Sequence, residues 1–181
     1  MGGDGSATLA GTPQEQGGKT NVTDQAFSLV TLHQYWEHYQ QRLIATITPL
    51  SSEQLALSVA SHQTIGELLG HMIGARFWWF HRWMGEAEPP DLVHWGTEQD
   101  LREAASLVRA FELTWQMISP ALCRWTAADL QHQVPPPASV AAEESAHTRE
   151  WIVWHVLEHE IHHGGELSLA LGGYGLQGIA I

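Results

Sequence analysis

The chain has 181 residues, a length that suits one domain with a sizeable core. Its formal net charge of −12 argues against nucleic acid or an anionic membrane surface as a partner, because both require a cationic face. The single cysteine, Cys123, excludes an intrachain disulfide and a cysteine-based metal site. Neither a membrane-spanning apolar run nor a secretory signal peptide is visible, so we expect a cytoplasmic protein.

The first part of the chain differs in composition from the rest. Residues 1–23 are rich in Gly, Thr, Gln and Ser, with almost no large apolar side chain. Such a segment cannot bury enough apolar surface to offset the entropy of ordering. We therefore predict a disordered tail at 1–23 and one folded domain at 24–181.

Four later segments carry apolar residues at helical spacing, and most have a capping residue or a Gly or Pro stop at their ends. These predicted helices are residues 24–48, 64–84, 97–119 and 148–173. Pro120 is expected to end the third helix, and short helices are expected at 52–55 and within 121–130. The fold class is therefore all-α, a four-helix bundle. The proline-containing loop at 131–145 leaves room for a crossover between the third and fourth helices.

The fourth predicted helix carries an unusual group of polar residues. Because a helix turns by about 100° per residue, these residues share a stripe roughly 100° wide. They are His155, His159, His162, His163 and Glu166. The rest of the circumference is mostly apolar, which predicts a buried helix. The polar stripe must then face a partner group, a metal or a small cavity, since unpartnered buried polar groups are costly.

Histidines four residues apart on a helix can bind one metal ion, because their side chains lie one turn apart on the same face. Two pairs meet this condition, His155/His159 and His159/His163. The second pair also fits the H-E-x-x-H pattern of zinc peptidases, in which the glutamate, here Glu160, is the catalytic base. The third metal ligand of such peptidases, a histidine or glutamate further along the chain, is missing here. Glu160 projects about 100° away from His159, so either a catalytic role or a packing role fits it.

The best candidate for a third ligand is His71, in the apolar face of the predicted second helix. A lone histidine there is usually structural, but a two-histidine helix in the same chain favours the ligand role. Three nitrogens with open coordination positions are typical of catalytic sites. Imidazole suits zinc, nickel, copper or iron, and an open position can hold water or a substrate thiolate. Candidate residues for the wall of a substrate pocket are Trp78, Trp79 and Trp154, with core packing as the alternative.

Two motifs together resemble the DinB-like superfamily, which includes transferases that use bacillithiol or mycothiol. They are Glu-Leu-Leu-Gly-His71-Met-Ile and His159-Glu-Ile-His-His163-Gly-Gly-Glu, within a similarity that covers about residues 25–175. The resemblance implies a four-helix bundle, often a homodimer, and a divalent metal, usually zinc or nickel, on His71, His159 and His163. The basic residue that usually follows the last histidine is replaced here by Gly164.

The leading functional hypothesis is a metal-dependent transferase that acts on a small molecule with a low-molecular-weight thiol. A metal-dependent hydrolase is the runner-up. A non-catalytic metal- or small-molecule-binding bundle is the second class of hypothesis, in which His155, His162 or Glu166 closes the coordination sphere. In the third, the histidines only pack and form hydrogen bonds.

Overall fold

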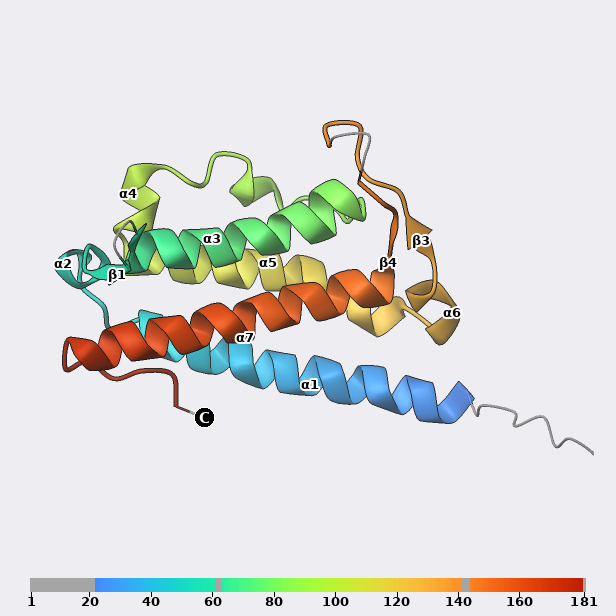
Figure 1. Cartoon of the computed structure of the whole chain (residues 1–181), viewed down its shortest axis with the longest axis horizontal. Coiled ribbons are helices and arrows are strands. Elements are labelled where there is room, and N and C mark those ends of the chain that lie inside the picture. The colour runs from blue at the N-terminus through green and yellow to red at the C-terminus, as the bar shows by residue number, and fades with distance from the viewer. Residues whose placement is uncertain (1–21, 61–62, 141–143, 181) are drawn as a thin grey trace, which may run out of the picture.

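The computed structural model describes residues 22–60, 63–140 and 144–180. Most of the tail predicted at 1–23 lies outside this part, and residues 22 and 23 begin the first helix. The prediction of an all-α four-helix bundle is confirmed (Figure 1). The long helices are α1 (Val22–Ile47), α3 (Ile65–Phe77), α5 (Ala104–Arg124) and α7 (Arg149–Gly173).

Short elements connect the long helices. A six-residue π-helix, η1 (Trp78–Trp83), continues α3 directly. The other short helices are α2 (Ser52–Leu55), η2 (Pro90–Leu92), α4 (Glu98–Leu101) and α6 (Ala127–Leu130). Two antiparallel strand pairs complete the chain, β1 (Ser58–Ala60) with β2 (Gln63–Thr64) and β3 (Gln133–Val134) with β4 (His147–Thr148).

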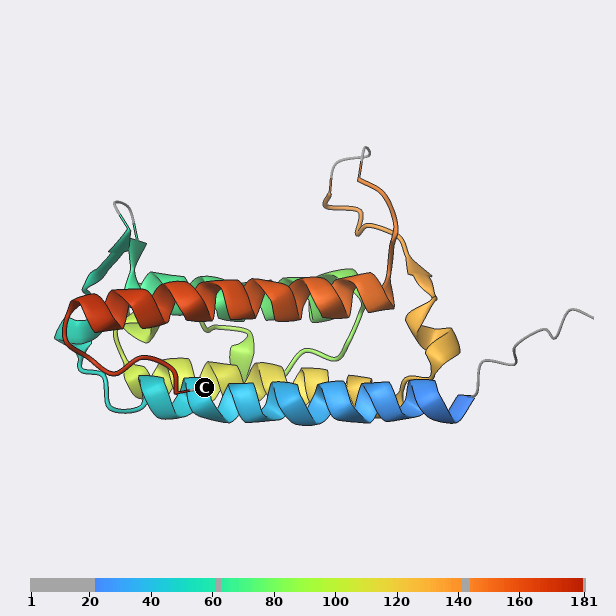
Figure 2. The ribbon, with the colours of Figure 1, turned by 60° about the horizontal axis from the view of Figure 1, so that its bottom comes forward.

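The helices form two layers, with α3 and α7 above α5 and α1 in Figure 2. Helices α1 and α7 run in one direction, and α3 and α5 run in the other (Figures 1 and 2). Parallel α3 and α5 require a long return, which residues 84–103 provide through η2 and α4. The crossover therefore lies between α3 and α5, and not in the 131–145 loop where the sequence left room for it.

Local signals place most helix ends correctly. Thr64 and Glu67 form the predicted capping box of α3, and Thr148 accepts a hydrogen bond from the Trp151 amide at the start of α7. Pro120 is an exception, because it lies inside α5 and does not end it. A proline there removes one backbone hydrogen bond, but the buried Leu122 beyond it keeps the helix on the core.

A buried polar network lies at the centre of the bundle and joins all four long helices. Arg76 of α3 and Glu160 of α7 form an ion pair in which neither side chain is exposed. Arg76 Nη2 donates to Glu160 Oε2 at 2.8 Å, and Trp36 Nε1 of α1 donates to the same oxygen at 3.0 Å. Arg76 Nη1 donates to the Phe111 carbonyl of α5 at 3.2 Å and to Thr114 Oγ1 at 3.3 Å. Apolar side chains surround this network on both sides.

Helices α1 and α7 approach closely beside this network. Tyr39 Oη donates to the backbone carbonyl of Glu160 at 3.1 Å. The next turn of α7 passes the same hydroxyl at Gly164, where an added Cβ would lie 1.7 Å from Tyr39 Oη. Glycine at this position therefore allows the contact, whereas at the neighbouring Gly165 nothing lies within 4 Å of an added Cβ.

We expect Gly164→Ala to destabilise the protein by about 1–3 kcal/mol, because the methyl group displaces Tyr39 and breaks its hydrogen bond to Glu160. Gly165→Ala is the matched control and should be neutral or stabilising by up to about 1 kcal/mol, since alanine is the better helix former. Urea unfolding of both variants measures the difference. Equal stabilities would contradict the close approach of α1 and α7.

Candidate metal centre

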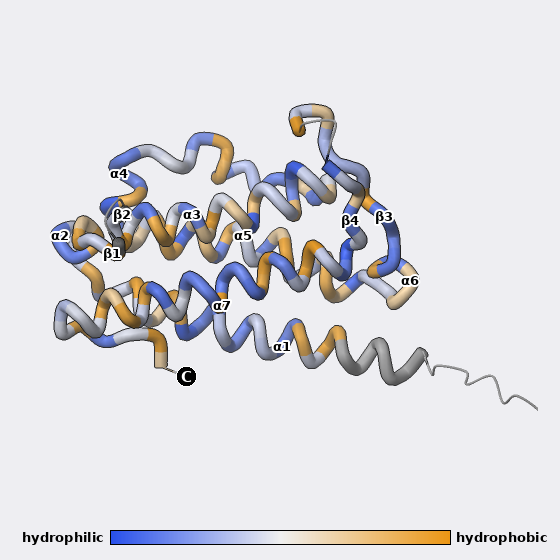
Figure 3. The backbone as a smooth tube through the Cα atoms, in the orientation of Figure 1, coloured by the Kyte–Doolittle hydropathy of each residue, from blue (hydrophilic) through white to orange (hydrophobic). Residues whose placement is uncertain are grey.

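Three histidines converge where α3 and α7 lie side by side. His71 projects from the middle of α3, and His159 and His163 lie one turn apart on α7. One ligand nitrogen of each lies within 4.8 Å of the others. His71 is exposed and the other two are half-buried, so the cluster faces solvent on one side. Figure 3 shows the corresponding hydrophilic stretch in the middle of α7.

The geometry of this cluster suits a shared ion. The ring centroids are 4.7 Å apart for His71 and His159, 5.0 Å for His71 and His163, and 4.4 Å for His159 and His163. The Nε2 atoms of His71 and His159 are 2.9 Å apart. Two imidazole nitrogens that share one zinc ion at about 2.0–2.1 Å lie roughly 3–3.5 Å from each other. Small rotations of the rings therefore suffice to place a divalent ion among these residues.

A carboxylate orients one of the three rings. His163 Nδ1 lies 2.9 Å from Glu166 Oε2, one turn further along α7. With its proton on Nδ1, His163 donates to Glu166, and its Nε2 carries the free lone pair that a metal requires. Hydrogen bonds of this kind are typical of metal-ligating histidines, because they fix the tautomer and the ring orientation. Glu166 therefore fits an orienting role beside His163.

The surroundings of His71 and His159 favour the neutral form of these two rings. Burial, followed by the charges of His163 and His71, lowers the pKa of His159 to about 4. Partial burial and the charge of His163 also lower the pKa of His71, although Glu166 opposes this shift. A histidine binds metal through a neutral nitrogen, so these two rings are ready ligands near pH 7 without a preceding loss of protons.

The structure does not bring Glu160, the predicted catalytic base, to the histidine cluster. Its side chain is fully buried, and both carboxylate oxygens are engaged by Arg76, with Trp36 as a further donor. A carboxylate held in this way cannot take a proton from a group at the solvent-facing cluster. We therefore correct the sequence-based assignment: Glu160 has a structural role, and its direction on α7, about 100° from His159, is the physical reason.

An aromatic row continues the histidine stripe toward the start of α7. His147, Trp151 and His155 stack on one another, with ring centroids 3.8 Å and 4.8 Å apart. Trp79 of η1 packs edge-on against His155 at 4.9 Å, so it lies beside the stripe as the pocket-wall hypothesis requires. His155 lies 6.4 Å from His159 by ring centroid. The remaining two tryptophan candidates, Trp78 and Trp154, are exposed.

His147 extends the row beyond the stripe predicted from the sequence, and steps of four residues lead back to it from His163 through His159, His155 and Trp151. The β3–β4 pair holds it there, because His147 pairs with Val134 just before α7 begins. Among the ligand alternatives, His162 contacts the ring of His163 at 5.0 Å, and the group His162, His163 and Glu166 has a ligand-like spacing of its own. His163 therefore belongs both to this group and to the cluster with His71 and His159.

Comparison with known proteins identifies the family. The model of the DinB family matches residues 19–181 of this chain. The chain belongs to the DinB family. The resemblance inferred from the two histidine motifs is thereby confirmed. No curated protein matches the sequence.

A solved structure supports the same fold. A DinB-like protein from Bacillus cereus aligns with a TM-score of 0.66 and 16% identity, over 83% of this chain and 95% of that one. At this identity the likeness concerns the fold alone. Among the residues that the structure describes, no helix is long and apolar enough to cross a membrane.

Gly164, at the position where the family resemblance leads us to expect a basic residue, has a structural explanation in this chain. Gly164 is buried against Tyr39, so no long side chain fits there without a movement of α1. The contact between α1 and α7 therefore excludes a basic side chain at this position.

The histidines make stability depend on pH. Histidines of the unfolded chain titrate near 6.5, whereas His159 in the folded protein has a pKa of about 4. The unfolded state therefore binds more protons between these values, and the free energy of unfolding of the metal-free protein falls as the pH drops through that window. His159→Asn should flatten this dependence, and His94→Asn, at an exposed histidine, should not. Urea unfolding of the parent and both variants across the window measures the change of the free energy of unfolding with pH. The same dependence in His159→Asn as in the parent would refute the neutral state of the half-buried His159.

Removal of the Glu166 carboxylate tests its orienting role. We expect Glu166→Ala to weaken metal binding by about 10- to 100-fold, because His163 loses the partner that fixes its ring. Glu158→Ala removes an exposed carboxylate from the same helix and should have little effect. Competition with a chromophoric chelator gives both affinities. An equal loss of metal affinity in both variants would mean that the removal of one negative charge, and not the orientation of His163, causes the effect.

Proposed function

We propose that this DinB protein binds one divalent metal ion through His71, His159 and His163 and transfers a small-molecule group with the help of a low-molecular-weight thiol. The observation that carries the proposal is the convergence of three imidazoles from two helices, with one side of the cluster open to solvent. DinB proteins generally bind metals, and three nitrogens with open positions are the pattern of a catalytic site. Imidazole donors suit zinc, nickel, copper or iron, and the family resemblance favours zinc or nickel among these metals.

The charge of the site favours an anionic ligand. A divalent ion bound there supplies a Lewis-acid position at which a thiol binds as its thiolate. The three neutral imidazoles add no negative charge of their own and leave the ion its full charge. The only carboxylate in contact with them among the described residues, Glu166, already accepts a hydrogen bond from His163. A thiolate therefore meets a local positive charge, although the whole chain carries a formal charge of −12.

The runner-up, a metal-dependent hydrolase, loses its expected base. Hydrolysis of the zinc-peptidase type needs a carboxylate that takes a proton from the attacking water. The glutamate of the H-E-x-x-H pattern is Glu160, and its carboxylate is held by Arg76 in the core. A thiol has a much lower pKa than water and needs no such base once it is bound to a cation. This difference supports the transferase over the hydrolase.

The surroundings of the cluster support a small-molecule substrate. The His155 ring lies 6.4 Å from that of His159 by centroid and packs against Trp79, and these two rings provide aromatic surface for the apolar part of a substrate. Access from solvent runs past His71, the most exposed of the three proposed ligands. The homodimer and the cytoplasmic location expected from the sequence remain predictions.

Cobalt substitution tests the thiol step directly. We expect N-acetylcysteine to produce a near-ultraviolet sulfur-to-cobalt charge-transfer band in the cobalt-loaded protein, and His163→Ala to abolish it. His94→Ala, at an exposed histidine, is the control. The loaded protein should also speed the attack of this thiol on 1-chloro-2,4-dinitrobenzene, which forms a carbon–sulfur bond and releases chloride. Absence of the band despite bound cobalt would contradict thiol activation, and thiol-independent ester hydrolysis would favour the hydrolase.

A further inference from the structure

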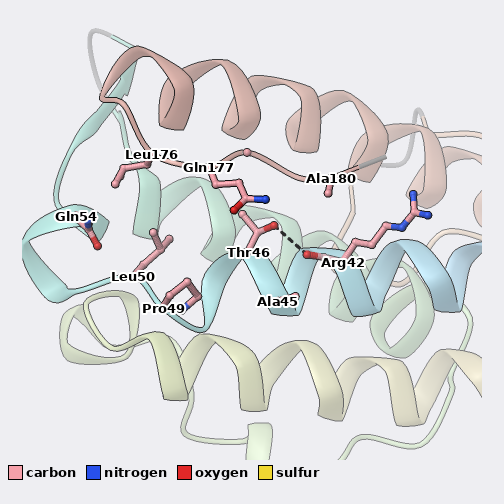
Figure 4. Close-up of a pocket in the computed structure, with 10 residues that line it drawn as sticks. Arg42, Ala45, Thr46, Pro49, Leu50, Gln54, Leu176, Gln177 and Ala180 are labelled. Carbon is pink, nitrogen blue, oxygen red and sulfur yellow. Dashed lines mark hydrogen bonds between the residues drawn. The ribbon is translucent and has the colours of Figure 1, made fainter.

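A groove on the opposite side of α7 from the histidines lies between the end of α1 and the chain segment that follows α7. Its volume is about 390 Å³. Figure 4 shows Arg42 near Ala180 at one end of the groove and Gln54 and Leu50 at the other. A volume in this range is typical of sites for small ligands. At about 30 Å³ for each water-sized group, it holds roughly a dozen non-hydrogen atoms.

The wall formed by residues 174–180 is held in place by hydrogen bonds. Gly175 turns the chain with a positive φ of 72°, and the Leu176 amide then donates to the Leu171 carbonyl at 2.8 Å. Further along, the Ile179 amide donates to Ser168 Oγ of α7 at 3.1 Å. Leu176 and Ile179 also pack against the buried core. The groove therefore has two anchored walls.

The inner surface of the groove is mainly apolar. Pro49, Leu50 and Leu176 lie along it, together with Ala45. Polar atoms come from Thr46, Gln54 and Gln177, and the Thr46 hydroxyl is already occupied, because it donates to the Arg42 carbonyl at 2.9 Å. Among the described residues that line the groove, none carries a carboxylate.

Arg42 differs from the other arginines of the described residues, because its guanidinium has no ionic, hydrogen-bonding or aromatic partner there. Every other arginine in that part of the chain contacts a carboxylate, a carbonyl or an aromatic ring. These arginines are Arg76, Arg82, Arg102, Arg109, Arg124 and Arg149. A free guanidinium at the edge of an apolar groove is a ready partner for a carboxylate, which it can bind through two parallel hydrogen bonds.

We propose that this groove binds a small organic carboxylate with an apolar body, in which the charged end pairs with Arg42 and the body lies against Leu50 and Leu176. Arg42 at one end of the groove matches the charged end of such a ligand, and the apolar surface of the groove matches its body. A medium-chain fatty acid such as octanoate, with ten non-hydrogen atoms, matches the volume estimated at about a dozen. The site uses none of the three clustered histidines and does not depend on the metal.

Calorimetric titration of the full chain with octanoate and with octanol tests the proposal. We expect Arg42→Gln to weaken octanoate binding by about 10- to 100-fold and to leave octanol binding unchanged, because only the acid uses the charged hydrogen bond. Arg102→Gln is the matched control, since it removes an exposed arginine that does not line the groove. No binding of octanoate at millimolar concentration would overturn the proposal, as would equal affinity in the Arg42 and parent proteins.

A second variant locates the bound ligand. Ala45→Trp places a large ring in the groove and should abolish the binding of both ligands, with normal unfolding in urea as the check of folding. Light scattering of the same variants addresses another occupant, a second copy of the chain. Loss of a dimer in both Arg42→Gln and Ala45→Trp would show that the groove is a subunit interface and would overturn the small-ligand assignment.

Discussion

Arg76 and Glu160 meet at the centre of the bundle, and most of the geometry of the site follows from this buried ion pair. Isolated charges in such a place are very costly, so each must keep its partners in the folded protein. Besides pairing with each other, Glu160 accepts a hydrogen bond from Trp36 on α1, and Arg76 donates to Thr114 and to the Phe111 carbonyl on α5. The network thus permits only one rotation of α3 and α7 about their axes.

That rotation determines where the histidines point. With Glu160 directed at the centre of the bundle, His159 and His163 lie about 100° and 60° to one side of it on α7. This side faces α3, where His71 completes the cluster. The same rotation turns Gly164 toward Tyr39 and explains why α7 has no room for a basic side chain at that position. The H-E-x-x-H sequence therefore has two roles. Its glutamate forms the buried ion pair, and its histidines are candidate metal ligands.

Much of this arrangement is predictable because its signals are local. The capping residues Thr64 and Thr148 and the spacing of the histidines lie within a few residues of the features they determine. The role of Glu160 is not local, because its partner Arg76 is 84 residues away and nothing in the nearby sequence identifies it. The position of the crossover and the helical Pro120 also depend on packing between distant segments. The helical spacing predicts that Glu160 points away from His159, but it does not predict that Arg76 is its partner.

We infer that one metal ion is shared by His71 on α3 and by the two clustered histidines of α7, His159 and His163. Elemental analysis of the untagged protein beside His71→Ala tests it most directly, with His94→Ala as the control for loss of a histidine. We expect about one equivalent of divalent metal in the parent and in the control, and its loss in His71→Ala. Metal retained at full occupancy in His71→Ala would exclude His71 as a ligand and would place the site within α7 alone.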